Sequence, residues 1–311
     1  MRLADVREVG IATTGAGAAP IRAAVGDGRH WDLRIRYIEI EPGAGPGAAI
    51  LDAADFLGDA AFVAHTGDGL LGEELAPLLD LVAHRRRDAM VLLHAGASKV
   101  ERDCLETRRM LRFAARGAPA RPGVTGVACF AAGALDAAAG VATWRDRPLE
   151  LSDLLARVEQ GGGCVRTHTT HTWRRFTGDL ADLLQLNRIA LERLDPVELP
   201  EYADSHIEGT VHIDPSADIR SAVIRGPVVI GAGAQITETY IGPYTSIGDR
   251  AHIEGTEVQH SIIGADAQIL HIGGPIDASV IGRGARVIRD FSLPRAIRLQ
   301  IGEGVEVAFC Q

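Results

Sequence analysis

The chain has 311 residues, a formal net charge of −9 and 46% hydrophobic residues, which is enough for a sizeable core in about two domains. The acidic balance argues against nucleic-acid binding and against attraction to anionic membranes, and no stretch approaches the roughly 18 apolar residues that cross a bilayer. The start, MRLADVREVG, lacks the apolar core of a signal peptide, and the four cysteines show no C-x-x-C spacing, so we expect a cytoplasmic protein with reduced thiols.

The first part of the chain alternates apolar runs with helical patterns. The segment LRIRYIEI at 33–40 has the period of two that is typical of a half-buried strand. Further strand candidates lie at 9–13, 62–64, 89–94, 124–130 and 164–170, and helix candidates at 21–25, 48–57, 73–85, 150–158 and 180–194. This alternation predicts an α/β layered sheet for residues 1–194.

A repeated hexapeptide follows the proline-containing segment DPVELPEYAD, for which we predict a linker at 195–204. The repeats lie at 213–219, 230–236, 247–253, 263–269 and 281–287, and each begins and ends with isoleucine or valine. Ile213, Ile230 and Ile247 are spaced by 17 residues, about three hexapeptides per turn. The pattern predicts a left-handed parallel β-helix over 205–311, with the aliphatic side chains stacked inside.

Three stretches carry a family resemblance. They are EVGIATTGAGAAPIRAAVGDGRHWDLRIRYIEI followed by DAADFLGD and HTGDGLL, then TGDLADLLQLNRIALERL, then VVIGAGAQITETYIGPYTSIGD. Together they resemble the sugar-1-phosphate nucleotidyltransferases, and in particular the long glucose-1-phosphate thymidylyltransferases with a C-terminal β-helix. The resemblance implies a Rossmann-like layered sheet and a reaction in which an NTP and a sugar 1-phosphate give an NDP-sugar and pyrophosphate.

The resemblance also implies a magnesium site made by two aspartates. Asp68, in AFVAHTGDGLLG, matches the first of them. The second belongs in a W-W-K-D-T-G segment, which here reads WRRFTG, so Phe176 stands at the aspartate position. A phenyl ring offers no oxygen to Mg²⁺, a cation that binds oxygen ligands. We therefore interpret Asp68 as the remnant of a metal site, and we expect Mg²⁺ as a cofactor only if the protein is active.

Of the other family motifs, two residues are retained and two segments are lost. Gly45 matches a glycine of the sugar-side loop, and Glu150 matches a glutamate near the sugar. The phosphate loop, GG-x-GTRL-x-P-x-T, would precede the first matched segment, so we expect it to be missing along with the first strand. The E-K-P segment should fall near 113–115, which supplies neither Glu nor Lys, and the only lysine, Lys99, lies too early.

Three functions follow from these matches. The first is a degenerate, non-catalytic homologue that binds a sugar phosphate or an NDP-sugar, or serves as a regulatory or scaffold subunit, in a homo-oligomer or hetero-assembly formed through the β-helix. The second is an active thymidylyltransferase-type enzyme completed by an upstream start or a partner chain. The third is a new activity in a reshaped pocket around His65, Asp68 and Glu150, where His65 could bind a transition metal or act as a base.

Two further patterns favour plain structural roles. TTGAGAAP at 13–20 half-resembles a dinucleotide fingerprint, but Pro20 takes the place of the third glycine, which favours a plain loop. His168 and His171 lie three apart on a predicted strand and so point to opposite faces, where exposed positions are expected. The histidines of the β-helix coils are expected at its surface, rather than in an acyltransferase site.

Overall fold

A computed structural model describes residues 6–97, 102, 105–113, 122–136, 147–202, 204–289 and 291. The chain divides into two units, Met1–Thr177 and Gly178–Gln311. Helix α8 (Leu180–Leu191) therefore belongs with the second unit. The predicted domain boundary after residue 194 and the predicted linker at 195–204 stay predictions.

The first unit opens with a β-α-β segment. Strands β1 (Glu8–Thr13) and β2 (Arg34–Glu39) pair in parallel and are joined by α1 (Gly15–Val25) and the short helix η1 (Arg29–Trp31). The expectation of a plain loop at 13–20 is wrong, because residues from Gly15 onward already form the first turns of α1 and Pro20 lies inside it. Alanine-rich sequence favours the helix strongly enough to include these glycines and the proline.

A four-stranded sheet forms the core of the first unit. Its order is β3-β6-β5-β7, with strands β3 (Phe62–His65), β5 (Ala89–His94), β6 (Gly123–Phe130) and β7 (Val165–Thr170). The central strands β5 and β6 are buried almost throughout, as their unbroken apolar runs predict. β6 runs antiparallel to both of its neighbours, β3 and β5, and β7 runs parallel to β5.

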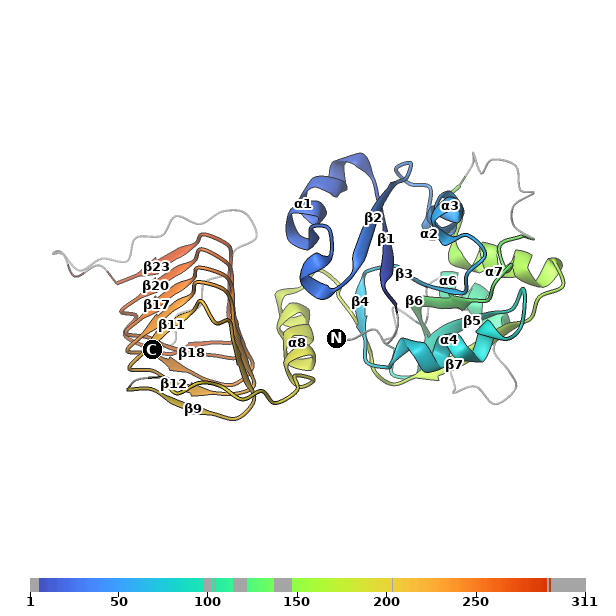
Figure 1. Ribbon diagram of the computed structural model, residues 1–311. Coiled ribbons are helices and arrows are strands. Elements are labelled where there is room, and N and C mark those ends of the chain that lie inside the picture. Colours follow the sequence, from blue (N-terminus) through green and yellow to red (C-terminus); the bar gives the residue numbers. More distant parts are fainter. Residues whose placement is uncertain are drawn as a thin grey trace. The chain divides into compact units, whose positions relative to one another are not determined.

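Helices cover this sheet and give it the predicted layers (Figure 1). Leu151, Leu154 and Leu155 of α7 (Leu151–Gln160) pack in one apolar cluster, while Leu78 and Val82 of α4 (Leu75–Ala83) pack in another. The remaining described helices of this unit are α2 (Pro46–Asp52), α3 (Ala54–Leu57), α6 (Leu105–Met110) and the short η2 (Leu111–Phe113). The single helix expected at 48–57 is thus two helices, separated at Ala53.

A separate pair of short antiparallel strands lies beside this core. β4 (Gly69–Leu71) pairs with β8 (Trp173–Arg175), and Gly69 is opposite Arg175. Neither strand is expected from the sequence, because three residues are too few to show a period of two. Trp173 is buried in the same apolar cluster as α4, which anchors β8 to the unit.

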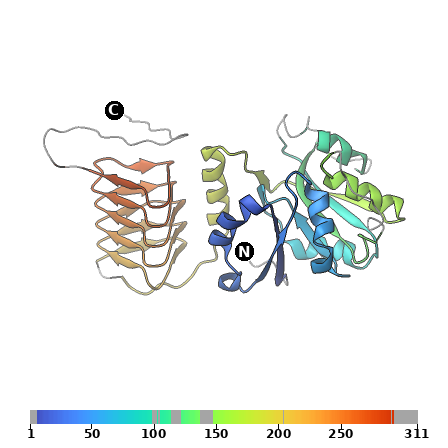
Figure 2. The ribbon, with the colours of Figure 1, turned by 90° about the horizontal axis from the view of Figure 1, so that it is seen from above.

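The second unit is the predicted β-helix. Parallel strands form three five-stranded sheets in the orders β10-β13-β16-β19-β22, β11-β14-β17-β20-β23 and β21-β18-β15-β12-β9. Figure 2 shows their coils as a stack. The strands are β9 (His206–Glu208), β10 (Val211–Ile213), β11 (Asp218–Arg220), β12 (Val223–Arg225), β13 (Val228–Ile230), β14 (Gln235–Thr237), β15 (Tyr240–Ile241), β16 (Thr245–Ile247), β17 (His252–Glu254), β18 (Glu257–Gln259), β19 (Ile262–Ile263), β20 (Gln268–Leu270), β21 (Ile276–Asp277), β22 (Val280–Ile281) and β23 (Arg286–Ile288).

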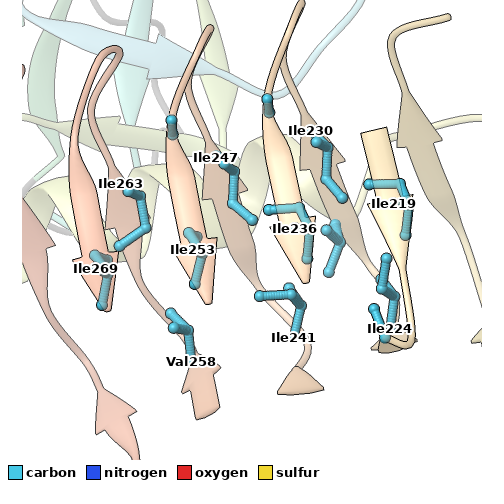
Figure 3. Close-up of a cluster of buried hydrophobic side chains, with 14 of the residues drawn as sticks. Ile219, Ile224, Ile230, Ile236, Ile241, Ile247, Ile253, Val258, Ile263 and Ile269 are labelled. Atoms are coloured by element: carbon cyan, nitrogen blue, oxygen red, sulfur yellow. The ribbon is translucent and has the colours of Figure 1, made fainter. Parts of the chain in front are cut away.

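The aliphatic residues of the hexapeptides stack inside the β-helix (Figure 3). Ile219 pairs in register with Ile236, and Ile236 with Ile253, so that each aliphatic side chain packs on its equivalent in the next coil. Residues at positive φ, such as Tyr244 and His260, turn the corners between the sheets. The left-handed β-helix predicted from the repeat is confirmed.

Helix α8 packs on the β-helix through Asn187 and through Arg188, whose guanidinium lies 5.1 Å from the centroid of the Tyr244 ring. The side-chain amide of Asn187 donates to the carbonyl of Tyr244 at 3.1 Å and accepts from the Ser246 hydroxyl at 2.6 Å. Both bonds lie within the second unit, which explains why α8 belongs to it. Across the described residues, every helix is too short or too polar to cross a membrane.

Candidate functional site

The strand pair β4–β8 places Asp68 opposite Phe176. Asp68 immediately precedes β4 and Phe176 immediately follows β8, and the Phe176 amide donates to the Asp68 carbonyl at 2.8 Å. The position that the resemblance assigns to the second metal aspartate is therefore a direct backbone neighbour of Asp68. The two positions have the proximity that a shared metal ion needs, but one of them carries a phenyl ring.

Gly69 allows this close pairing. A Cβ atom at Gly69 would lie only 2.5 Å from the ring of Trp173 on the opposite strand. The glycine thus lets the indole lie across β4, where only 3% of Trp173 is exposed. The glycine beside Asp68 serves the packing of the strand pair, which a larger side chain would force apart.

The carboxylate of Asp68 accepts hydrogen bonds from side chains of its own unit. Its Oδ2 atom accepts from Nε of Arg175 at 2.8 Å and lies 2.8 Å from Nη2 of the same guanidinium. Its Oδ1 atom accepts from the Thr66 hydroxyl. A carboxylate has about four acceptor positions, so these contacts use most of them. The negative charge of Asp68 is matched by the positive charge of Arg175.

This donor set does not fit a magnesium ion. Mg²⁺ requires oxygen ligands in octahedral geometry and usually takes one or two carboxylates together with water and phosphate oxygens. Here one carboxylate is paired with Arg175, and the residue opposite it, Phe176, offers none. Within the residues that the structure describes, no three His, Cys, Asp or Glu side chains are grouped so that they could hold a metal ion.

His65 lies at the end of β3, close to Asp68. Its Nδ1 atom accepts from the Gly67 amide at 2.7 Å, and its ring centroid is 5.5 Å from that of Trp173. Partial desolvation of the imidazole lowers the pKa of His65 below its ordinary value, and the nearby Asp68 carboxylate opposes this shift. Both features favour a neutral ring with its proton on Nε2, so a metal ion would have to displace the bond from Gly67 or that proton.

Gly45 and Glu150 are brought together at a second place in this unit. Gly45 has φ of 91° and precedes α2, and a Cβ there would lie 2.6 Å from the carbonyl oxygen of Leu149. The Leu149 amide donates to Ala44, and the Gly47 amide donates to Leu149, both at 2.8 Å. The loop before α2 is therefore held against Leu149, the residue that precedes Glu150.

Glu150 also has a structural role as the N-cap of α7. Its side chain accepts from the Asp153 amide, and the Asp153 side chain accepts from the Glu150 amide at 3.1 Å, which forms a capping box. Burial and then the nearby carboxylates of Glu106 and Asp153 raise the pKa of Glu150, while Arg109 and Arg147 act in the opposite direction.

The neighbours of Glu150 form a charged network that the sequence did not reveal. Arg147 binds Asp153 with two bonds of 2.7 and 2.8 Å, which hold the pKa of that carboxyl below its usual range. Glu106 accepts from the amide of Ser152 at 2.8 Å and from its hydroxyl at 2.7 Å. The sequence singled out Glu150 alone, and the contact between Glu106 and Ser152 joins residues 46 apart in the chain.

Two histidines away from these sites pair with carboxylates, one cysteine is buried, and three motif positions lie outside the described residues. His168 Nε2 is 2.8 Å from Glu73 Oε2, and His260 Nδ1 is 3.0 Å from Asp277 Oδ1 at the β-helix surface. Cys129 is a free, buried thiol whose burial raises its pKa to about 12, which makes it a packing residue. The motif positions Lys99, Ala114 and Ala115 fall outside the described residues.

Comparison with known proteins identifies relatives along almost the whole chain. It is 31% identical over 317 residues to a glucose-1-phosphate thymidylyltransferase of Streptomyces antibioticus, which covers 98% of this chain and 87% of that protein. A protein of the same name from Streptomyces griseus is 30% identical over 97% of this chain and 86% of its own length. The low-salt glycan biosynthesis nucleotidyltransferase Agl11 of Haloferax volcanii is 28% identical over 99% of this chain and 88% of its own.

Two other comparisons add less. A crystal structure of a Bacillus anthracis protein, described as a glucose-1-phosphate thymidylyltransferase in complex with sucrose, aligns with a TM-score of 0.47 and 16% identity over 62% of this chain and 78% of that one. No family model matches the chain. The resemblance drawn from the motifs is confirmed by the sequence relatives.

Proposed function

We propose that this chain, which belongs to the sugar-1-phosphate nucleotidyltransferase family, no longer transfers nucleotidyl groups and instead binds a sugar phosphate or an NDP-sugar as a regulatory or scaffold subunit. One observation carries the proposal. Asp68, which the motif resemblance matches to the first metal aspartate of the family, faces Phe176 across β4–β8 and is paired with Arg175.

The absence of a second carboxylate opposes metal binding more strongly than the ion pair between Asp68 and Arg175 does. The side chains of Asp68 and Arg175 are each 35% exposed, and ion pairs exposed to this extent contribute about 1 kcal/mol or less. A divalent cation could displace Arg175 at that cost. It would then find one carboxylate where the reaction requires two, and the charge that develops on the phosphates would lack its stabilising metal.

The sugar side supports continued binding. Gly45 and Glu150 are the two residues that the resemblance assigns there, and backbone bonds through Leu149 hold their loops together. The α7 capping box positions the Glu150 carboxylate at the start of the helix. A site that keeps this arrangement can bind a sugar hydroxyl without any chemistry on the nucleotide.

The test is a pyrophosphate-release assay on the purified 311-residue chain with glucose 1-phosphate, each NTP and Mg²⁺. We expect no release above the rate without protein. Thermal unfolding with a panel of sugar phosphates and NDP-sugars should show a rise in melting temperature, because a ligand that binds only the folded state stabilises it. Pyrophosphate release that is abolished by Asp68→Asn would overturn the proposal.

An active enzyme completed by another chain or an upstream segment is the second candidate. It is favoured by the relatives named as thymidylyltransferases, which align over nearly the whole chain. It predicts that Phe176→Asp, which restores the second carboxylate, raises nucleotidyl transfer in the completed protein. If Phe176→Asp does not raise nucleotidyl transfer, the second candidate function is contradicted.

Assembly through the β-helix is part of the same proposal. The outer surface of the β-helix carries exposed apolar side chains such as Val223, which is 39% exposed. Light scattering coupled to gel filtration should give a mass that is a multiple of the 33.0 kDa chain. If the protein is a monomer at all concentrations, the proposed role as a self-assembling scaffold is contradicted.

A further inference from the structure

The carboxylate of Glu106 reaches the first turn of α7 from another helix, α6. Its Oε1 atom accepts from the Ser152 amide at 2.8 Å, and its Oε2 atom accepts from the Ser152 hydroxyl at 2.7 Å. Ser152 is only 4% exposed, so the serine end of both bonds is shielded from water. Hydrogen bonds to a charged carboxylate are stronger than bonds between neutral groups. Glu106 therefore fixes the start of α7, which directly follows Glu150.

The amides at this end of α7 already have acceptors within the protein. The Ser152 amide donates to Glu106, and the Asp153 amide donates to the side chain of Glu150. Amides at a helix N-terminus are otherwise the groups that bind a phosphate. Here two of them donate to carboxylates, whose negative charge also repels a phosphate. The remaining lone pairs of these carboxylates can accept hydrogen bonds, so this end of α7 suits the hydroxyl groups of a sugar ring.

The charges that act on Glu150 come from two elements. Glu106 and Arg109 lie on α6, whereas Arg147 and Asp153 lie before and within α7. Burial, and then Glu106 and Asp153, raise the pKa of Glu150, while Arg109 and Arg147 act in the opposite direction. Arg147 binds Asp153 through two hydrogen bonds, so these two charges largely offset each other. The loop before α2, which also packs here, contributes no ionisable side chain.

We propose that Glu106 is a positioning residue of the sugar side, which holds the first turn of α7 so that the carboxylate of Glu150 meets a hydroxyl group of the sugar ring. The inference rests on the proposed function as a protein that binds a sugar phosphate or an NDP-sugar. It adds that the ligand turns its ring, and not its phosphate, toward α7. Because the charge of Glu106 also acts on Glu150, its role should be visible in the pH dependence of binding.

Three variants separate the position of Glu106 from its charge. Glu106→Gln keeps an oxygen for the Ser152 amide and a donor for the Ser152 hydroxyl, but removes the charge. Ser152→Ala removes one of the two anchoring bonds and keeps the charge. Glu106→Asp also keeps the charge, but withdraws the carboxylate by one methylene group. Glu159→Gln is the matched control, because Glu159 lies near the other end of α7, with its carboxylate 3.7 Å from Arg112.

The first measurement is the binding of two probes, glucose 1-phosphate and dTDP-glucose, by titration calorimetry at neutral pH. Wild-type protein should bind at least one of them. Ser152→Ala and Glu106→Asp should each weaken that binding by about threefold to tenfold, because a hydrogen bond that holds α7 is lost. Glu159→Gln should bind like wild type. Circular dichroism checks that each variant is folded.

The second measurement is the pH dependence of the same binding, which a merely structural role of Glu106 would not shift. A carboxylate accepts a sugar hydroxyl best when it is ionised, so binding should strengthen as pH rises through the pKa of Glu150. Removing the charge of Glu106 lowers the pKa of Glu150, so in Glu106→Gln the rise should occur at lower pH than in wild type. It should stay in place in Ser152→Ala and in Glu159→Gln. The phosphate of the probe titrates equally for every protein, so the comparison between proteins isolates Glu150.

The outcomes separate this inference from the proposed function. Binding that is unchanged in Ser152→Ala and Glu106→Asp, or a pH dependence that does not move in Glu106→Gln, overturns the role of Glu106 and leaves a sugar-phosphate or NDP-sugar binding protein. Weaker binding in the first two variants together with a shift to lower pH in the third supports that role. No binding of either probe overturns both.

Discussion

The β-helix and the β4–β8 strand pair use their residues in opposite ways. In the β-helix, each buried isoleucine has an equivalent one coil away, and the same contact is made many times over. In the strand pair, Asp68, Gly69 and Trp173 each make a contact that nothing else repeats. A replacement in the β-helix therefore alters one of many equivalent contacts, whereas in the strand pair a single replacement, such as Phe176, changes what the site can bind.

The largest change in the free energy of unfolding should come from the β-helix interior. It would show that one buried position matters for stability even where the same contact is repeated in other coils. Ile253 is fully buried between Ile236 and Ile269. Ile253→Ala should lower the free energy of unfolding by about 2–5 kcal/mol, because it removes buried methyl groups and leaves a cavity. Urea denaturation measures the change. Gln235→Ala, at an exposed polar position of the same β-helix, should change it by less than about 0.5 kcal/mol.

A smaller effect should follow from one added methyl group in the strand pair. Gly69→Ala would place a Cβ atom 2.5 Å from the Trp173 ring, and the strands must separate to admit it. We expect a loss of about 1–3 kcal/mol in unfolding free energy, as for other overpacked sites. Gly17→Ala in α1 adds the same methyl group where the nearest atom is 3.6 Å away and should stabilise the protein instead. Equal losses in both variants would contradict the special fit at Gly69.

The smallest effect concerns the ionisation of Glu150. Its pKa is raised in the folded protein, so its contribution to stability is present in full below the unfolded pKa and is lost as pH rises through the folded value. Glu150→Gln keeps the cap oxygen and removes the ionisation. Relative to wild type, the variant should therefore be more stable at pH 7 than at pH 4, by less than about 1 kcal/mol. Unfolding curves at the two pH values check the sign, and a reversed sign would contradict the burial of this carboxyl.

The two regions also differ in what could be predicted from sequence. The spacing of 17 between Ile213, Ile230 and Ile247 determines both the coil and the strand register, because each coil repeats the same local choice. The layered sheet followed from long apolar runs such as the one in β5. The β4–β8 pair did not, since strands of three residues carry no periodic signal.

The candidate site was predictable only as far as single residues match a motif. Asp68 and Phe176 were matched to the two metal positions, and the structure places them side by side. The ion pair between Asp68 and Arg175 was not foreseen, because it joins residues 107 apart and depends on the register of two short strands. The arginine run in WRRFTG was the available signal, and its meaning appears only once the partner strand is known.

The coil register of the β-helix has a consequence for how the chain can change length. One stack of inward positions pairs Ile to Ile from Ile213 to Ile281, so a whole coil could be inserted or deleted between two others while the aliphatic contacts of that stack are kept. Each coil would move the end of the stack by one interstrand spacing, about 4.8 Å. The length of the β-helix can therefore change in fixed steps of one coil, while the first and last coils keep their own surfaces.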